Sequence, residues 1–336
     1  MSAIEMLTER GKLVDDFLLK MLRLGASDEL YKIAEHQVVS GGKRARPAMT
    51  ILCCEAVGGD IKVAIPAAAG IELIHNYTLI FDDVIDHSDL RRGYPTVRAL
   101  YGDVMSFLVG MHYREAIFEA VRRSVRSRRI EMLLSWTIRR IIEGERLDVL
   151  FEQAGRDSEY ISRMMYRDIS EDDYLRMIEA KTAVLFEAAC EAGGIVGGGK
   201  PTQIDALSRY GLSCGVAFQI QDDILDVVGE TERLGKEAGK DIREHKLGNI
   251  TVLYSLEELS KNSRDKLLMM LSSPELSDSQ VSEAVEIVLS TNALKRAEET
   301  SREYIAKAKS GLKVLPESEA KSMLMSVADF VVERSF

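Results

Sequence analysis

Residues 79–86 read Leu-Ile-Phe-Asp-Asp-Val-Ile-Asp, and residues 218–226 read Phe-Gln-Ile-Gln-Asp-Asp-Ile-Leu-Asp. Each stretch places the pattern Asp-Asp-x-x-Asp after a mostly apolar run. Residues four apart are neighbours on one face of a helix, so Asp82 lies beside Asp86 and Asp222 beside Asp226. The sequence therefore predicts two apolar helices that each end in a cluster of carboxylates.

Clustered carboxylates on a helix repel one another and favour a bound cation. Magnesium usually takes one or two carboxylates and completes its octahedron with water and phosphate oxygens. A single Asp-Asp-x-x-Asp is more simply explained as a solvated helix end. Two copies on matching apolar helices favour magnesium sites.

The rest of the chain also has a helical hydrophobic period. At the N-terminus, the apolar residues Ile4, Leu7, Val14, Leu18 and Met21 follow the spacing of one amphipathic helix. Further helices are predicted at about 29–38, 43–57, 63–86, 99–124, 128–153, 171–193, 203–228, 249–261, 278–289, 291–313 and 317–334. No segment is typical of a domain linker. We expect an all-α fold in which residues 1–336 form a single large helical bundle.

Composition excludes several classes of protein. The 336 residues carry a formal charge of −10, so a general nucleic-acid binder is not expected. The N-terminus lacks the layout of a secretory signal, and no apolar run approaches the ~18 residues of a transmembrane segment. The four cysteines show no paired framework. We expect a cytoplasmic protein with buried thiols.

Basic residues accompany the aspartates along the sequence. Lys43 and Arg46 open a helix, Arg91 and Arg92 follow the first acidic stretch, and Lys181 precedes a threonine. The polar segment after the second acidic stretch carries Lys236, Lys240, Arg243 and Lys246. Cations beside carboxylates suit a polyphosphate bridged by magnesium. Other cations are expected to be ordinary surface charges, namely Arg44, Lys200, Arg122 and Arg123.

Six motifs, taken in order, resemble those of the trans-isoprenyl diphosphate synthases. They are Gly-Gly-Lys-x-x-Arg-Pro at 41–47, the aspartate stretch at 79–86, Leu-Arg-Arg-Gly-x-Pro-Thr at 90–96, Lys-Thr at 181–182, the aspartate stretch at 218–226, and Gly-Lys…Gly-Lys-Asp at 235–241. The resemblance covers about residues 35 to 260. It implies a helical bundle with a deep central pocket, with the aspartates facing each other at its top, and a homodimer.

The resemblance also implies a role for individual residues. The implied magnesium site residues are Asp82 and Asp86 with Asp83 in support, and Asp222 with Asp223 and Asp226. Arg91 resembles the arginine for the allylic diphosphate, while the implied site for isopentenyl diphosphate comprises Lys43, Arg46, His75 and Arg92. The groups implied at the reacting centre are Lys181, Thr182, Gln219 and Lys236, with Lys246 a weaker match.

These roles imply a condensation of isopentenyl diphosphate with an allylic diphosphate (dimethylallyl, geranyl or farnesyl). The allylic carbocation must be kept from water, and residues 228–248 are a possible lid. Tyr77 stands five residues before Asp82, as the bulky residue does in archaeal-type geranylgeranyl synthases. Because Thr78 is not a second aromatic residue, we favour a twenty-carbon product over the fifteen-carbon farnesyl diphosphate. An ideal helix does not by itself turn Tyr77 towards the substrate chain.

Some positions depart from the family pattern. Phe81 stands where many members have His, Met111 where Asp is common, and Glu145 where Gln precedes x-x-Asp148. Leu247-Gly248-Asn249 replaces a more usual Lys-Thr-containing stretch. These departures affect the expected rate and lid closure, while the proposed ligands are all present.

Three other interpretations account for part of the sequence. Residues 194–200 nearly match a phosphate-binding loop, but Pro201 replaces its hydroxyl residue and a helix precedes it. Terpene cyclases share Asp-Asp-x-x-Asp but generally lack the second full copy. A non-catalytic subunit of a heteromeric synthase tends to have damaged aspartate motifs, whereas both motifs are intact here.

Overall fold

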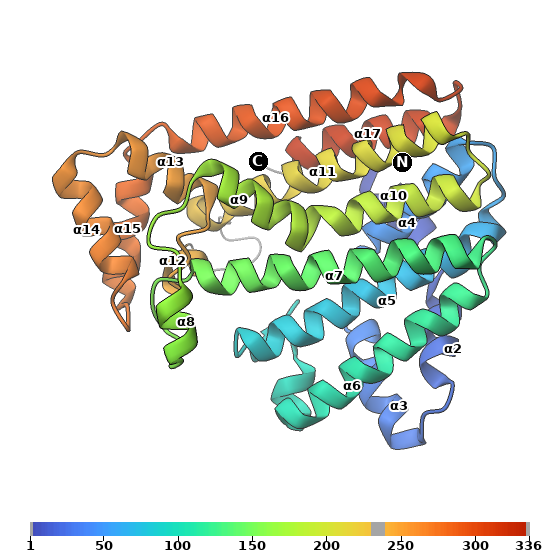
Figure 1. Ribbon diagram of the computed structural model, residues 1–336, viewed down its shortest axis with the longest axis horizontal. Helices are drawn as coiled ribbons and strands as arrows, with labels where there is room; N and C mark the ends of the chain where they lie inside the picture. The colour runs from blue at the N-terminus through green and yellow to red at the C-terminus, as the bar shows by residue number, and fades with distance from the viewer. Residues whose placement is uncertain (1–2, 230–238, 334–336) are drawn as a thin grey trace. The chain divides into compact units, whose positions relative to one another are not determined.

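The structure is a computed structural model and describes residues 3–229 and 239–333. The chain divides into two compact units. One comprises Met1–Ile138, Leu185–Gly211 and Gly311–Val327, and the other comprises Arg139–Val184, Leu212–Ser310 and Ala328–Phe336. Most of the described residues are helical (Figure 1), which confirms the predicted all-α class.

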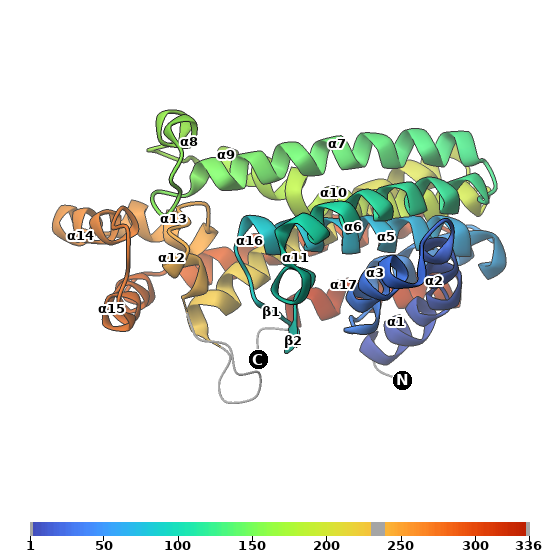
Figure 2. The ribbon, with the colours of Figure 1, turned by 90° about the horizontal axis from the view of Figure 1, so that it is seen from below.

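The first unit is built around α5. Its helices are α1 (Ala3–Lys12), α2 (Asp15–Arg23), α3 (Asp28–Val39), α4 (Ala45–Ala56), α5 (Ile61–Ile85) and α6 (Val97–Arg122). A short antiparallel hairpin, β1 (Leu90–Arg91) and β2 (Tyr94–Pro95), connects α5 to α6 and is labelled in Figure 2. The 3₁₀ turn η2 (Leu312–Val314) also belongs to this unit.

Helix α5 packs against both α4 and α6. The side chains of Ala64, Ala67, Ala68 and Ala69 are buried, and small residues let neighbouring helices approach closely. Asp60 caps the helix by accepting a hydrogen bond from Lys62 N at 2.7 Å. Among the described residues, α5 alone is long and apolar enough for a membrane span, and 67% of its apolar window is buried in the protein. The sequence-based expectation that no apolar run is long enough to span a membrane is therefore not met, because α5 has the length and the hydropathy.

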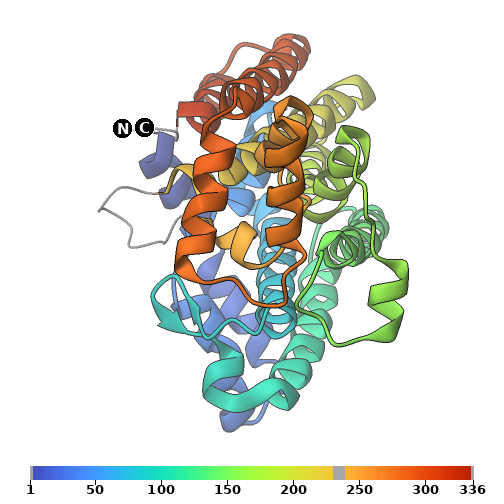
Figure 3. The same ribbon diagram turned by 90° about the vertical axis from the view of Figure 1, so that its left-hand side faces the viewer.

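The second unit contains shorter elements. They are α8 (Glu159–Met164), α9 (Glu171–Ile178), the π-helical turn η1 (Glu179–Ala183), α12 (Lys240–Arg243), α13 (Ile250–Glu258), α14 (Lys261–Leu271) and α15 (Asp278–Leu289). Helices α14 and α15 pack together in the orange part of Figure 3. The remaining helices contribute residues to both units and are α7 (Ser127–Phe151), α10 (Val184–Val196), α11 (Pro201–Val228), α16 (Ala293–Gly311) and α17 (Glu319–Glu333).

The predicted helices agree with the observed ones within a few residues, with three differences. The single N-terminal helix is two helices, α1 and α2, separated at Leu13 and Val14. Helices α8, α12 and α14 have no counterpart in the prediction. The predicted helix 171–193 is interrupted by the π-helical turn η1.

Candidate functional site

The first aspartate cluster, Asp82, Asp83 and Asp86, stands at the C-terminal end of α5. Asp83 is buried, whereas Asp82 and Asp86 are partly exposed. Arg91 Nε donates a hydrogen bond to Asp83 Oδ1 at 2.8 Å. The middle carboxylate is therefore bound inside the protein, and the outer two are accessible to a ligand.

The hairpin after α5 brings Arg91 back to Asp83. Its two-residue turn consists of Arg92 (φ 55°) and Gly93 (φ 79°), both in the left-handed region. A two-residue hairpin with both φ values positive matches the twist of its strands, and glycine adopts this conformation without strain. The Arg-Arg-Gly motif thus supplies both a turn and two guanidinium groups beside the cluster.

Residues predicted to bind isopentenyl diphosphate gather in the first unit. Arg46 Nη1 lies 3.4 Å from His75 Nε2, and the Arg46 guanidinium stacks over the Phe186 ring at 4.3 Å. Arg92 Nη1 donates to the carbonyl of Gly41, in the turn before α4. Burial, and after it the charges of Arg46 and Arg92, lower the pKa of His75 well below its ordinary value. Lys43 is exposed on the same turn.

Arg44 is not the surface charge that the sequence predicted. It is 6% exposed and forms ion pairs with Glu72 at 3.1 Å and with Asp15 at 2.9 Å. Its Nη2 also donates to the Val38 carbonyl at 2.8 Å. A buried charge needs such partners, so Arg44 ties the turn before α4 to α5 and α2. The other predicted surface cations, Lys200, Arg122 and Arg123, are exposed.

Tyr77 belongs to an aromatic group where α5 meets α6. Its ring lies edge-on to Phe81, with 5.0 Å between centroids, and the Phe81 ring lies 5.7 Å from Phe107. A Cβ added at Gly110 would come within 2.5 Å of the Phe81 ring. Phe81 therefore occupies space that α6 leaves open at a glycine, and it supports the Tyr77 ring.

The second aspartate cluster, Asp222, Asp223 and Asp226, lies near the end of α11. Asp222 is exposed and Asp223 is buried. Three donors bind the Asp223 carboxylate, namely Gln219 Nε2 at 3.0 Å, Tyr174 Oη at 2.9 Å and Ile250 N at 3.0 Å. The middle aspartate is again held inward, and Gln219 also accepts a 2.8 Å hydrogen bond from Thr182 Oγ1.

Asp226 has a further carboxylate, Asp241, as a neighbour. Asp241 N donates to Asp226 Oδ2 at 3.1 Å. Burial, and then the charge of Asp241, raise the pKa of Asp226 to about 7. The same two causes raise the pKa of Asp223 well above its ordinary value. This crowding of oxygen ligands is electrostatically unfavourable without a cation.

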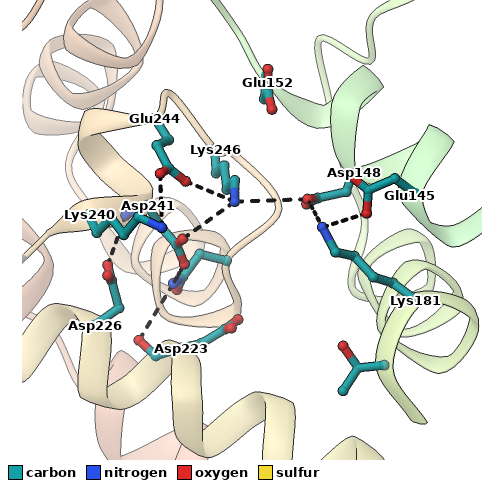
Figure 4. Close-up of polar contacts among 12 residues, drawn as sticks. Glu145, Asp148, Glu152, Lys181, Asp223, Asp226, Lys240, Asp241, Glu244 and Lys246 are labelled. Carbon is teal, nitrogen blue, oxygen red and sulfur yellow. Dashed lines mark hydrogen bonds and ion pairs between the residues drawn. The ribbon is translucent and has the colours of Figure 1, made fainter. Parts of the chain in front are cut away.

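Lys181 bridges two carboxylates of α7 (Figure 4). Its Nζ lies 2.5 Å from Asp148 Oδ2 and 2.8 Å from Glu145 Oε2. A Cβ added at Gly144 would lie 2.2 Å from Lys181 N, so the glycine lets the π-helical turn approach α7. Burial raises the pKa of Asp148, but Lys181 and Lys246 outweigh it and lower the pKa to about 2.

Lys246 joins this network from the segment after α12. Its Nζ lies 2.9 Å from Glu244 Oε2 and 3.9 Å from both Asp148 Oδ2 and Asp241 Oδ1. Lys236, which was predicted at the reacting centre, and part of the predicted lid 228–248 lie outside the described residues. The described part of that segment contains the short helix α12, a turn at Glu244 and His245, and a β-bridge between Lys246 and Glu152.

Several interacting residues of the two units were not assigned from the sequence. They are Glu72 in the first unit, and Tyr174, Asp241, Glu244 and Asn249 in the second. Asp241 carries a signal, because it ends the Gly-Lys…Gly-Lys-Asp motif. Tyr174 and Glu72 carry no recognisable sequence signal, because their partners lie at distant positions in the sequence.

The donor set fits a hard divalent cation. Within residues 3–229 and 239–333, no three His, Cys, Asp or Glu side chains group as an all-protein metal site. Each cluster does present accessible carboxylate oxygens, and magnesium is commonly held by one or two carboxylates plus substrate phosphates. Asp82 with Asp86, and Asp222 with Asp226, could serve in this way.

A cavity of about 550 Å³ opens elsewhere in the second unit. It is lined by residues of 152–167 together with Ser272, Pro274 and Glu275. None of the predicted site residues lines it. The deep central pocket stays a prediction.

Comparison with known proteins places the chain in a family. The polyprenyl synthetase family model matches residues 27–288. A short chain isoprenyl diphosphate synthase of Methanothermobacter thermautotrophicus is 38% identical over 99% of each chain.

Solved structures agree. The geranylgeranyl pyrophosphate synthetase of Pyrococcus horikoshii superposes with a TM-score of 0.89, at 34% identity, over 99% of this chain and 98% of the other. A polyprenyl synthase from Caulobacter crescentus, complexed with calcium and isoprenyl diphosphate, has a TM-score of 0.87 at 31% identity over 99% and 98%. With the six motifs in place, the chain belongs to the polyprenyl synthetase family.

Proposed function

We propose that this protein is a trans-prenyltransferase that condenses isopentenyl diphosphate with an allylic diphosphate and makes geranylgeranyl diphosphate. The observation that carries the proposal is the repeated design of the two clusters. In each, the middle aspartate is buried and hydrogen-bonded, and outer carboxylates are accessible. The geranylgeranyl synthetase of P. horikoshii, similar over nearly the whole chain, supports the choice of product.

In the first unit, Asp82 and Asp86 would hold Mg²⁺ with the allylic diphosphate, while Asp83 supports them from beneath. Arg91 donates to Asp83 through Nε, which leaves its Nη groups to donate to a phosphate. Lys43, Arg46, His75 and Arg92 would bind isopentenyl diphosphate. A neutral His75 adds a hydrogen bond to Arg46 without adding another positive charge.

In the second unit, Asp222 and Asp226 would hold Mg²⁺, with Asp223 as the buried support. Lys181 and Lys246 would hold the departing diphosphate, and Lys236 belongs to the same set. Thr182 and Gln219 form a hydrogen-bonded chain to Asp223. This chain fixes the orientation of the Gln219 amide at the reacting centre.

The reaction begins with cleavage of the allylic C–O bond, and pyrophosphate leaves. When bound, Mg²⁺ neutralises the charge that develops on that diphosphate. Arg91 in the first unit, and Lys181 with Lys246 in the second, would each add fixed positive charge to a bound diphosphate, which favours the transition state over the ground state. The double bond of isopentenyl diphosphate then attacks the allylic carbocation, and a proton is lost to the departing pyrophosphate.

Tyr77 would limit the length of the product, because its ring is supported by Phe81 against α6. We propose dimethylallyl, geranyl and farnesyl diphosphate as primers. We also propose that residues 1–336 act as a single synthase domain, that the protein is a cytoplasmic homodimer, and that it has no membrane span.

The test is incubation of the purified chain with Mg²⁺, labelled isopentenyl diphosphate and each of the three primers, followed by sizing of the products. A twenty-carbon diphosphate is expected from every primer. A fifteen-carbon end product would identify a farnesyl synthase instead. A chain that makes no product alone, but restores it when mixed with a partner synthase, would be a non-catalytic subunit.

A further inference from the structure

We propose that Asn249 is a positioning residue that fixes Asp241 against the second aspartate cluster and thereby strengthens metal binding there. The inference rests on the proposed function, because it concerns the magnesium site of that cluster. The inference assigns a role to Asn249, the last residue of the Leu247-Gly248-Asn249 run that departs from the family pattern.

The two ends of the Asn249 amide have different partners. Asn249 is fully buried and caps α13, where its Oδ1 accepts from Thr251 N at 2.9 Å and Val252 N at 3.4 Å. Its Nδ2 donates to Asp241 Oδ2 at 2.9 Å, and lies 3.5 Å from the Asp223 carbonyl oxygen. Backbone N–H groups only donate and an ionised carboxylate only accepts, so these partners fix the orientation of the amide.

Asp241 carries this restraint to the cluster. Its backbone N–H donates to Asp226 Oδ2 at 3.1 Å, while its carboxylate accepts a hydrogen bond from Asn249. Its Oδ1 lies 3.9 Å from Lys246 Nζ. A change at Asn249 would therefore reach Asp226 and Lys246 through one residue. Groups that orient metal-site carboxylates in this way are commonly worth a factor of ten or more in metal affinity.

A helix cap alone does not require asparagine. Serine, threonine and aspartate cap helices about as well, because each offers an acceptor to the first N–H groups. The asparagine amide accepts from α13 through Oδ1 and donates to Asp241 through Nδ2. Serine has one hydroxyl, on a shorter side chain, for both tasks. Serine at position 249 would keep the cap and lose the reach to Asp241, so the two roles can be separated by mutation.

The experiment compares the wild type with Asn249→Ser, Asn249→Ala and Ser260→Ala. Ser260 caps α14, and its loss controls for a weakened helix terminus away from the cluster. The probe is Mg²⁺ with inorganic pyrophosphate, and the readout is the rise in unfolding temperature as Mg²⁺ is titrated. This readout does not depend on turnover.

For Asn249→Ser we expect an unfolding temperature in EDTA near that of the wild type, and an Mg²⁺ midpoint raised about tenfold. Ser260→Ala should keep the wild-type midpoint. In an Asp241→Asn background, Asn249→Ser should have no further effect, because the two residues act in series. At low Mg²⁺, Asn249→Ser should also turn over substrate more slowly than the wild type, and excess Mg²⁺ should restore most of that turnover.

Two results would overturn the inference, and they are distinguishable. An unchanged Mg²⁺ midpoint in Asn249→Ser, with a normal wild-type response, would reduce Asn249 to a helix cap. A wild-type chain with neither an Mg²⁺-dependent shift nor a prenyl product would overturn the proposed function itself.

Discussion

Arg91 Nε donates a 2.8 Å hydrogen bond to Asp83 Oδ1, and the Asp83 side chain is almost wholly buried. Asp223, the equivalent residue of the second cluster, is likewise buried and accepts hydrogen bonds from Tyr174 and Gln219. Each Asp-Asp-x-x-Asp thus contains one carboxylate that the protein binds and others that remain accessible. The middle aspartate of each pattern therefore has a structural role, and the outer carboxylates are the ones proposed to bind a ligand.

Substitution of Arg91 tests this anchoring. Arg91→Gln removes the charged partner from a buried carboxylate, and we expect it to lower the free energy of unfolding by about 2 kcal/mol. Urea denaturation measures the change. The double variant Arg91→Gln/Asp83→Asn should recover part of the loss, since neither charge then remains. Unchanged stability in Arg91→Gln would contradict the anchoring role.

Arg44 should be among the costliest cations to remove. Arg44→Met leaves Glu72 buried beside an apolar side chain, and we expect a loss of about 3–5 kcal/mol. Arg122→Ala is the matched control, because Arg122 is exposed and pairs along its own helix with Glu119. Equal denaturation midpoints for the two variants would refute the structural role of Arg44.

His75 predicts a pH-dependent stability. Burial and the nearby guanidinium groups lower its pKa in the folded state, so below about pH 6.5 the unfolded chain binds a proton that the folded chain does not. Stability should therefore fall as the pH drops, by up to about 1.4 kcal/mol per unit. His75→Gln should flatten this dependence. Parallel denaturation curves at about pH 7.5 and about pH 5.5 measure it, and identical slopes in both proteins would exclude His75 as the cause.

We expect the aromatic side chains Tyr77 and Phe81 on α5 to limit the length of the product. Tyr77→Ala removes the ring that stacks edge-on against Phe81, and we expect products longer than twenty carbons. Gly110→Ala should displace the Phe81 ring and also broaden the product range. Tyr94→Ala, at an exposed tyrosine of the hairpin, is the control. A product range unchanged in both α5–α6 variants would mean that Tyr77 does not limit chain growth.

The sequence predicted the helices well because their hydrophobic period is long and regular. It missed features that depend on tertiary contacts. Helix α1 ends where Gly11 allows Arg44 to approach, since an added Cβ would lie 2.4 Å from Arg44 Cβ. The π-helical turn at Lys181 depends on close packing against Gly144. Helix α14 has only a narrow apolar face, formed by Leu267, Met270 and Leu271.

The site residues divide in the same way. The aspartates, arginines and lysines carried their own signal, through spacing and through the resemblance. The burial of Arg44 did not, because its partners Glu72 and Asp15 lie on other helices. The sequence also could not show that Asn249 donates a hydrogen bond to Asp241, because this contact depends on how the segment after α12 folds back.

We expect both aspartate clusters to be needed for one magnesium-dependent prenyl transfer. The direct measurement is the turnover of labelled isopentenyl diphosphate by the wild type, Asp82→Ala and Asp222→Ala, with the fold of each checked by circular dichroism. We predict that each variant loses turnover by about two orders of magnitude or more and keeps its helical spectrum. Near-normal turnover in both variants would contradict the account.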